Sequence, residues 1–511
     1  MERTRPFFWL IIALSLWQAV SLLSPGSLVF AGPLAIADYM RQNFGLLARA
    51  TSATTQTALW GFLWGNLAAV LMAAFIILLP KAERFISLLA LVVFCLPMLA
   101  TGPILRVISG PGDMPQIALA ALAVYYSTYL ALIVGLRAMP QSWPDLMAIY
   151  GRGAITTLMV VRARASLPYF FVGLQIAAPA AFLGAMIGEF TGAERGLGVL
   201  TLRAMRALDV EATYTLALLA ATIAMLGYAA FGWFGKWCVG YVPEIILSPA
   251  TSAARRPFWR RIVVAIALTI IILLLWQLIL DAFGLSRFFA KRPGDVWIFL
   301  TSNAEARMTL INAFTQTLAT TIPGYLAGLL LGVALAMIVV LIPSLSALLM
   351  PVAVALRAVP IITTAPLIVL ALGRGPLGTI TVVAVMIFFP TFLVCLKGLR
   401  QTPGQVLDLF RIYRVGRLRQ LFSAQVPTML PALFAAAKMA VPAAILAVTT
   451  TEWLATGQGL GVLMALTATT SDYNMLWSCI VVITLAAVLL YACIVALERA
   501  VLRVYASEQL I

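Results

Sequence analysis

Few side chains in this 511-residue sequence are of types that carry out chemistry. Histidine is absent, which removes imidazole general bases, Ser–His triads and the commonest metal ligand. The five cysteines form no CxxC pair, so the sequence predicts neither a disulfide framework nor a zinc site, and we expect no metal or other cofactor. No lysine is followed by serine or threonine, so a phosphate-binding loop of the GxxxxGKS or GxxxxGKT type is missing. This inventory indicates a protein that is not an enzyme and does not itself hydrolyse ATP.

Three charged residues stand out because they lie in or beside strongly apolar segments. Glu189 and Glu452 each follow an apolar run, where a carboxylate can belong to an outer gate, help to dock a soluble partner, or be solvated at a membrane surface. Arg357 lies inside an apolar run, where it either lines a path suited to an anionic solute or is a structural arginine that snorkels or bonds backbone carbonyls. Residue type alone leaves these alternatives open.

The composition places these residues in a membrane protein. The chain is 63% hydrophobic and 10% charged, whereas a soluble domain has about a quarter of its residues charged. We therefore predict an all-α integral membrane protein with about twelve spans, each about 20 residues long. The predicted spans lie near 7–23, 58–80, 85–106, 116–137, 169–190 and 212–234, and near 262–283, 318–342, 347–371, 377–397, 431–451 and 475–497.

The net charge of +16 is explained by the loops rather than by nucleic-acid binding, which we do not expect. Basic residues gather after every second span, as at Lys81, Arg137, Lys236 and Arg400, which predicts that both termini are cytoplasmic. Arg195, Arg203 and Arg206 fall on the other side and weaken this bias without reversing it. We interpret the first apolar run as a retained span rather than a cleaved signal peptide.

An internal repeat is the most informative feature of the sequence. A shift of 263 positions aligns Glu189 with Glu452 (452 − 189) and keeps glycines, prolines and acidic residues in one register. The Gly-Leu-Gly-Val-Leu segment at 196–200 recurs at 459–463. We therefore predict a first unit over 1–234, a cytoplasmic linker over 235–261 and a second unit over 262–511. Each unit has an even number of spans, so the units form a parallel repeat with a pathway between them.

Each unit also carries a cytoplasmic stretch between its fourth and fifth spans in which a short amphipathic helix is predicted. An acidic residue opens this helix, apolar side chains follow at helical spacing, and Gly or Arg ends it. Such a helix either docks in a groove of a soluble partner or lies on the lipid surface. The residues are Asp145, Leu146, Ile149, Tyr150 and Gly151 in the first unit, and Asp408, Leu409, Ile412, Tyr413 and Arg414 in the second.

These stretches resemble the EAA coupling loop of ATP-binding-cassette (ABC) importer permeases, with Gly151 at the motif's glycine and Arg414 replacing it in the second unit. The segments from Glu189 and Glu452 through the Gly-Leu-Gly repeats resemble the nitrate, sulfonate and taurine permeases. The resemblance implies a type I importer permease fold in a bacterial inner membrane, with two family units fused in one chain. It further implies two copies of a separate ATPase on the coupling loops and a periplasmic or lipid-anchored binding protein that delivers a small-molecule substrate. Relatives carry solutes as different as bicarbonate and vitamin precursors, so the substrate is left open.

The main alternative is a secondary active transporter, which can also have two parallel six-helix halves. The short loop Lys81-Ala-Glu-Arg84 lacks the Gly-Asp-Arg-Gly-Arg pattern of the major-facilitator transporters. Carboxylates suited to proton coupling are also nearly absent from the predicted spans. The sequence therefore favours the ABC permease.

Overall fold

The computed structural model describes residues 15–19, 21–22, 31–137, 142–240, 258–345, 365, 368–369, 372–373 and 375–505. All regular structure within these ranges is helical, as predicted. Arg357 and most of the first and ninth predicted spans lie outside the described residues.

The first half runs from α2 to α11. Its helices are α2 (Pro33–Gln42), α3 (Phe44–Leu78), α4 (Glu83–Phe94), α5 (Met98–Ser109), α6 (Met114–Arg137), α7 (Ser142–Ile149), α8 (Ala154–Thr157), α9 (Ala163–Phe190), α10 (Leu197–Arg206) and α11 (Val210–Val239). A 3-10 turn, η1 (Pro80–Ala82), precedes α4, and a π-helical segment, η2 (Leu158–Arg162), joins α8 to α9. Helix α11 continues past the predicted end of the first unit at residue 234.

The second half repeats this order. Its helices are α12 (Phe258–Ala282), α13 (Pro293–Ser302), α14 (Ala304–Leu341), α17 (Pro376–Arg400), α18 (Gly404–Ile412), α19 (Arg417–Gln420), α20 (Val426–Thr451), α21 (Leu460–Thr469) and α22 (Tyr473–Tyr505). Two π-helical segments, η3 (Leu421–Gln425) and η4 (Glu452–Thr456), lie at the two ends of α20. The unit bounds themselves stay a prediction.

Eight helices in the described residues are long and apolar enough to cross a membrane, and each matches a predicted span. The third predicted span, 85–106, differs because α4 and α5 meet at 93°. Pro97 explains this bend: proline disfavours a helical conformation at the preceding residue and supplies no N–H for the helix. In the described part of the seventh predicted span, the apolar helix covers 266–282.

Small residues set the packing within each half. Helix α3 packs on α6, and its repeat counterpart α14 packs on α17. A Cβ at Gly65 would lie 2.6 Å from the carbonyl oxygen of Ala121, and a Cβ at Gly328 would lie 2.7 Å from that of Ala384. Glycine lets these helix backbones approach closely, which is how membrane helices gain contact without a hydrophobic driving force. The two equivalent glycines show that the sequence repeat is also a structural repeat.

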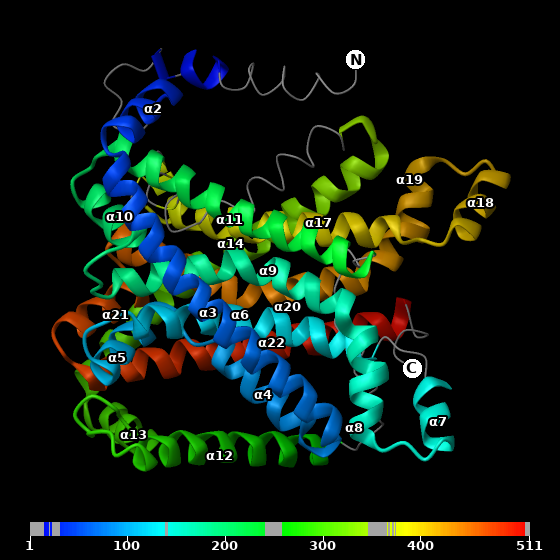
Figure 1. The fold of residues 1–511 in the computed structure, drawn as a ribbon, viewed down its shortest axis with the longest axis horizontal. Helices are drawn as coiled ribbons and strands as arrows, with labels where there is room; N and C mark the ends of the chain where they lie inside the picture. Colours follow the sequence, from blue (N-terminus) through cyan, green and yellow to red (C-terminus); the bar gives the residue numbers. More distant parts are fainter. Residues whose placement is uncertain are drawn as a thin grey trace.

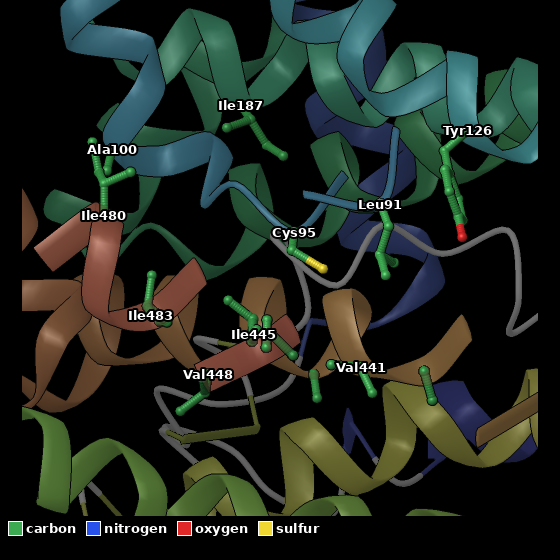
Figure 2. Close-up of a cluster of buried hydrophobic side chains, with 14 of the residues drawn as sticks. Leu91, Cys95, Ala100, Tyr126, Ile187, Val441, Ile445, Val448, Ile480 and Ile483 are labelled. Atoms are coloured by element: carbon green, nitrogen blue, oxygen red, sulfur yellow. The ribbon is translucent and has the colours of Figure 1, made fainter. Parts of the chain in front are cut away.

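The two halves meet in an apolar core. Figure 2 shows side chains from α4, α5, α6 and α9 of the first half facing side chains from α20 and α22 of the second. Helix α5 contacts α20 and α21 across the boundary between the halves, while α4 contacts α12 and α22. The labelled residues are Leu91, Cys95, Ala100, Tyr126 and Ile187 from the first half, and Val441, Ile445, Val448, Ile480 and Ile483 from the second.

The short helices lie at opposite ends of this bundle. Helices α7 and α18 project from one end, whereas α10, α21 and α13 lie toward the other (Figure 1). We call these the coupling end and the outer end.

Candidate functional site

At the outer end, Glu189 and Thr54 hold the start of α10. The hydroxyl of Thr54 donates to Glu189 Oε1 at 2.6 Å, and the amide of Gly198 donates to Oε2 at 2.6 Å. The Thr54 hydroxyl in turn accepts a hydrogen bond of 2.8 Å from the amide of Leu197. Two of the amides that a helix start leaves unpaired are thus satisfied, and the carboxylate lies at the positive end of the helix dipole. We call this set the first clamp.

The same arrangement recurs 263 positions later around α21. Thr317 donates to Glu452 Oε1 at 2.8 Å, and the amide of Gly461 donates to Oε2 at 2.8 Å. The amide of Leu460 donates to the Thr317 hydroxyl at 2.9 Å. We call this set the second clamp. Its four groups match those of the first clamp, so the repeat has preserved a hydrogen-bond network and not only a helix order.

Burial decides one of the alternatives for these carboxylates. Glu189 and Glu452 are each 3% exposed, so the interpretation as a solvated carboxylate at a membrane surface is wrong. In each clamp, both carboxylate oxygens accept hydrogen bonds from groups of the protein itself. A part in an outer gate or in docking a soluble partner stays a prediction. Sequence reasoning missed Thr54 and Thr317, although their equal spacing from the two glutamates, 135 residues in each half, was available as a signal.

Glycine is required at the turn before each short helix. Gly196 has φ of +130° and Gly459 has φ of +90°, a region that other residues rarely adopt. A Cβ at either position would collide with the carboxyl group of the clamp glutamate. These glycines therefore form tight turns that let the carboxylate reach the start of the helix.

An aromatic pair joins the two halves directly beside the clamps. The rings of Phe190 and Trp453 pack edge to face with their centroids 5.7 Å apart. These residues are repeat counterparts, since 453 − 190 equals the repeat offset of 263. Equivalent residues of two parallel halves can touch each other only near the axis that relates the halves. The pair therefore lies at the boundary between the halves, near the axis that relates them, a position that no sequence feature singled out.

At the coupling end, α7 and α18 expose large apolar side chains. Ile149 is 81% exposed and Ile412 is 76% exposed. Tyr150, Tyr413, Leu146 and Leu409 are also exposed. The structure thus brings the predicted apolar residues of each loop together on one short helix or directly after its end, and it places the two helices at the same end of the bundle (Figure 1).

The start of the second coupling helix differs from the prediction. Asp145 lies in the first turn of α7, as expected for an acidic residue that favours the helix dipole. Asp408 lies in the second turn of α18, because α18 begins at Gly404, and its carboxylate pairs with Arg411 at 3.0 Å. The prediction that Asp408 opens its helix is therefore wrong.

Both coupling helices end with the same backbone turn. Gly151 has φ of +68°, and Arg414 adopts φ of +50° at the equivalent position. A hydrogen bond from the amide of Arg152 to the carbonyl of Met147 closes the first turn, and one from Val415 to Phe410 closes the second, both at 2.9 Å. This is the bond pattern of a Schellman end, which favours glycine. Arg414 thus preserves the loop conformation and carries the strain of a left-handed residue.

A buried ion pair joins α20 to α22. Lys438 of α20 donates to both carboxylate oxygens of Glu498 of α22, at 2.9 and 2.8 Å. Sequence reasoning did not single out this pair, although a lysine inside a predicted span was a signal for it. Among the described residues, no group of three or more cysteine, aspartate or glutamate side chains is arranged to hold a metal ion.

Comparison with known proteins agrees with this geometry. The family model described as "Binding-protein-dependent transport system inner membrane component" matches the chain twice, over residues 65–240 and 324–504. A probable ABC transporter permease protein of Haemophilus influenzae is 30% identical over 234 residues, which are 45% of this chain and 94% of that protein. The riboflavin transport system permease protein RibX of Chloroflexus aurantiacus is 26% identical over 42% of this chain and 84% of its own length. The formylaminopyrimidine transport permease protein ThiX of Halalkalibacterium halodurans is 28% identical over 29% of this chain and 60% of its own length.

Proposed function

Because the chain belongs to the family of binding-protein-dependent transport system inner membrane components and is an ABC importer permease, we propose that its two halves form one complete translocation path without a second permease chain. The observation that carries this proposal is that each half supplies its own clamp, its own short outer helix and its own coupling helix. The three relatives described above match 45%, 42% and 29% of this chain. ATP hydrolysis belongs to a separate partner subunit, and a binding protein delivers the solute.

The coupling end faces the cytoplasm in this proposal. Arg137 and Arg400 end the helices that precede α7 and α18, and Arg417 follows α18. Basic residues at the coupling end agree with the positive-inside bias. Helix α22 also ends there, which supports a cytoplasmic C-terminus (Figure 1). The N-terminus and the 235–261 linker are assigned to the same side. Labelling of an introduced Ser252→Cys from outside intact cells would contradict this orientation.

The two coupling helices dock two copies of the ATPase, one on each. Each helix exposes apolar side chains to water, and a groove on a partner protein would cover these side chains. Burial of one isoleucine side chain contributes roughly 1.5–3 kcal/mol, so these positions carry much of the contact. The surroundings of α18 are more basic than those of α7. The basic residues are Arg411, Arg414, Arg417 and Arg419. Exposed ion pairs contribute about 0.2–1 kcal/mol each, so they adjust the contact rather than create it.

The outer end carries the gate. Phe190 and Trp453 close the route on the axis, and the clamps fix the helices on either side of them. The binding protein then docks over α10, α21 and α13, which lie toward this end (Figure 1). Glu189 and Glu452 act here by holding the outer helices, not by touching the solute.

Purification of the permease together with a co-expressed ATPase subunit tests this proposal. Native mass spectrometry is expected to show two ATPase copies on one permease chain. Replacing Ile149 and Ile412 together with serine should weaken ATPase binding at each site by about 10–100-fold. The matched control replaces both with leucine and should retain the complex. Full retention of both ATPase copies by the serine variant would show that α7 and α18 are not the docking elements.

A further inference from the structure

We propose that the two segments through which the coupling loops return to the membrane bind anionic phospholipids of the cytoplasmic leaflet. The first segment is 154–164, and the second is 417–427, its counterpart at the repeat offset of 263. We call them the first and second return arms. Arginines of the arms contact the headgroup phosphates, and the acyl chains cover apolar side chains of the arms. This inference rests on the proposed function, because it uses the orientation that places the coupling end in the cytoplasm.

The two return arms share one backbone arrangement. The first passes through α8 and η2 into α9, and the second passes through α19 and η3 into α20. The π-helical segments η2 and η3 lie at equivalent positions of the repeat. Helices α8 and α19 run across the direction of the long helices, and each arm comes directly before a predicted span, 169–190 or 431–451 (Figure 1). A segment that precedes a span and runs across it lies along the membrane surface.

Each return arm exposes a pair of large apolar side chains, and the two pairs are repeat counterparts. Ile155 and Met159 are 61% and 69% exposed in the first arm. Their counterparts Leu418 and Phe422 are 62% and 59% exposed in the second. Another side of each arm packs on the bundle, since η2 contacts α6 and η3 contacts α17. Side chains four positions apart share a helix face, so each arm presents an apolar face that the rest of this chain leaves uncovered.

The charge of the return arms selects an anionic partner. The sequence has no aspartate or glutamate in residues 146–188 or in residues 409–451. Arg164 is exposed at the end of the first arm, and Arg417 and Arg419 are exposed in the second. Arginine can bind a phosphate group through two parallel hydrogen bonds, and basic residues beside a membrane span attract anionic lipids. An apolar face next to unopposed arginines therefore matches a phospholipid, which carries acyl chains and a phosphate in one molecule.

The position of the return arms favours lipid over the ATPase as the cover of their apolar faces. Helices α7 and α18 project from the bundle, whereas the arms connect them back to α9 and α20 (Figure 1). In the first arm the exposed face continues into α9, because Leu167, eight positions after Met159, is also exposed. Helix α9 then crosses the membrane. The apolar face of the arm is therefore continuous with a membrane-spanning helix, as expected of a segment that lies in the lipid interface.

Site-specific photo-crosslinking in the reconstituted permease–ATPase complex tests the return arms directly. A benzoylphenylalanine side chain in place of Met159 or Phe422 is expected to form adducts mainly with phospholipid, detected by mass spectrometry of the permease. The same side chain in place of Ile149 or Ile412 is the matched control. These two residues lie on the coupling helices, so their adducts are expected mainly with the ATPase.

Vesicles that contain phosphatidylcholine and phosphatidylglycerol in a fixed ratio test the headgroup. Adducts from Met159 and Phe422 positions should be enriched in phosphatidylglycerol over that ratio. Arg164→Gln together with Arg419→Gln should lower this enrichment about fivefold, because one basic residue at an anionic surface changes binding by about that factor. Arg203→Gln together with Arg206→Gln removes two arginines from the outer end and should keep the wild-type enrichment.

Three results would overturn the lipid surface. Adducts from Met159 and Phe422 positions that contain mainly ATPase would assign the return arms to the docking surface. Lipid adducts without enrichment of phosphatidylglycerol, or with the same enrichment in the Arg164 and Arg419 double variant, would remove the anionic headgroup. Failure of the proposed function gives a different result, because the control positions Ile149 and Ile412 would then form no adducts with the ATPase.

Discussion

Replacing Thr317 with valine removes the hydroxyl that connects both parts of the second clamp. Valine has nearly the same shape as threonine and lacks only the hydroxyl, so the change acts on the hydrogen bonds rather than on the packing of α14. The change deletes the donor to Glu452 Oε1 and the acceptor for the Leu460 amide. Both groups are buried, and water cannot replace the lost partner. The start of α21 is thereby weakened without any change to α21 itself.

The size of the effect follows from these two bonds. A buried amide left without an acceptor costs about 1–3 kcal/mol, and a hydrogen bond to a charged group contributes about 1.5–3 kcal/mol. The two terms share one hydroxyl and do not add fully, so we expect local opening of α21 to become easier by about 2–3 kcal/mol. Since 1.4 kcal/mol corresponds to a factor of ten, amide hydrogen exchange in α21 should quicken about 30–150-fold.

Hydrogen exchange of the purified permease, followed by mass spectrometry of peptides, measures this effect. The peptide covering α21 should respond in Thr317→Val, while the peptide covering α10 serves as an internal control held by the intact first clamp. Thr54→Val should give the reverse pattern. Thr317→Ser keeps the hydroxyl and should exchange like wild type. Unchanged exchange in α21, or equal acceleration of α10 and α21, would refute the idea that each clamp holds its own outer helix.

Three further changes have defined outcomes. Gly459→Ala should lower the free energy of unfolding of the permease by about 1–3 kcal/mol, measured by unfolding in detergent. The positive φ at this position disfavours alanine, and the added methyl would collide with the carboxyl group of Glu452. Arg414→Gly should slow local exchange at the end of α18 about fivefold by relieving about 1 kcal/mol of strain, whereas faster exchange would contradict the left-handed assignment. Trp453→Ala and Phe190→Ala should each raise passive solute leakage through reconstituted permease, and Trp453→Phe, which keeps an aromatic contact, should not.

Much of this architecture could be predicted because it depends on the types and spacing of residues along the chain. The repeat offset, eight of the spans and the position of the coupling helices follow from hydropathy and from glycines in register. The bend at Pro97 was missed because hydropathy averages over a window and does not register one conformational break. Thr54, Trp453 and Lys438 were missed for a different reason. Their roles depend on a partner distant in sequence, and composition does not identify partners.

The fusion of two units has a physical consequence that separate subunits lack. In a pair of identical chains every substitution occurs twice, on both sides of the axis. In this chain Lys438 has Gln175 as its repeat counterpart, and a bulky Trp453 meets a smaller Phe190. The clamps, by contrast, are the same in both halves. The residues that hold a helix start are identical in the two halves, whereas the counterpart residues at the boundary between the halves differ. A solute without two-fold symmetry can then meet a path that is also asymmetric, which two copies of one unit cannot offer while they remain in symmetric arrangement.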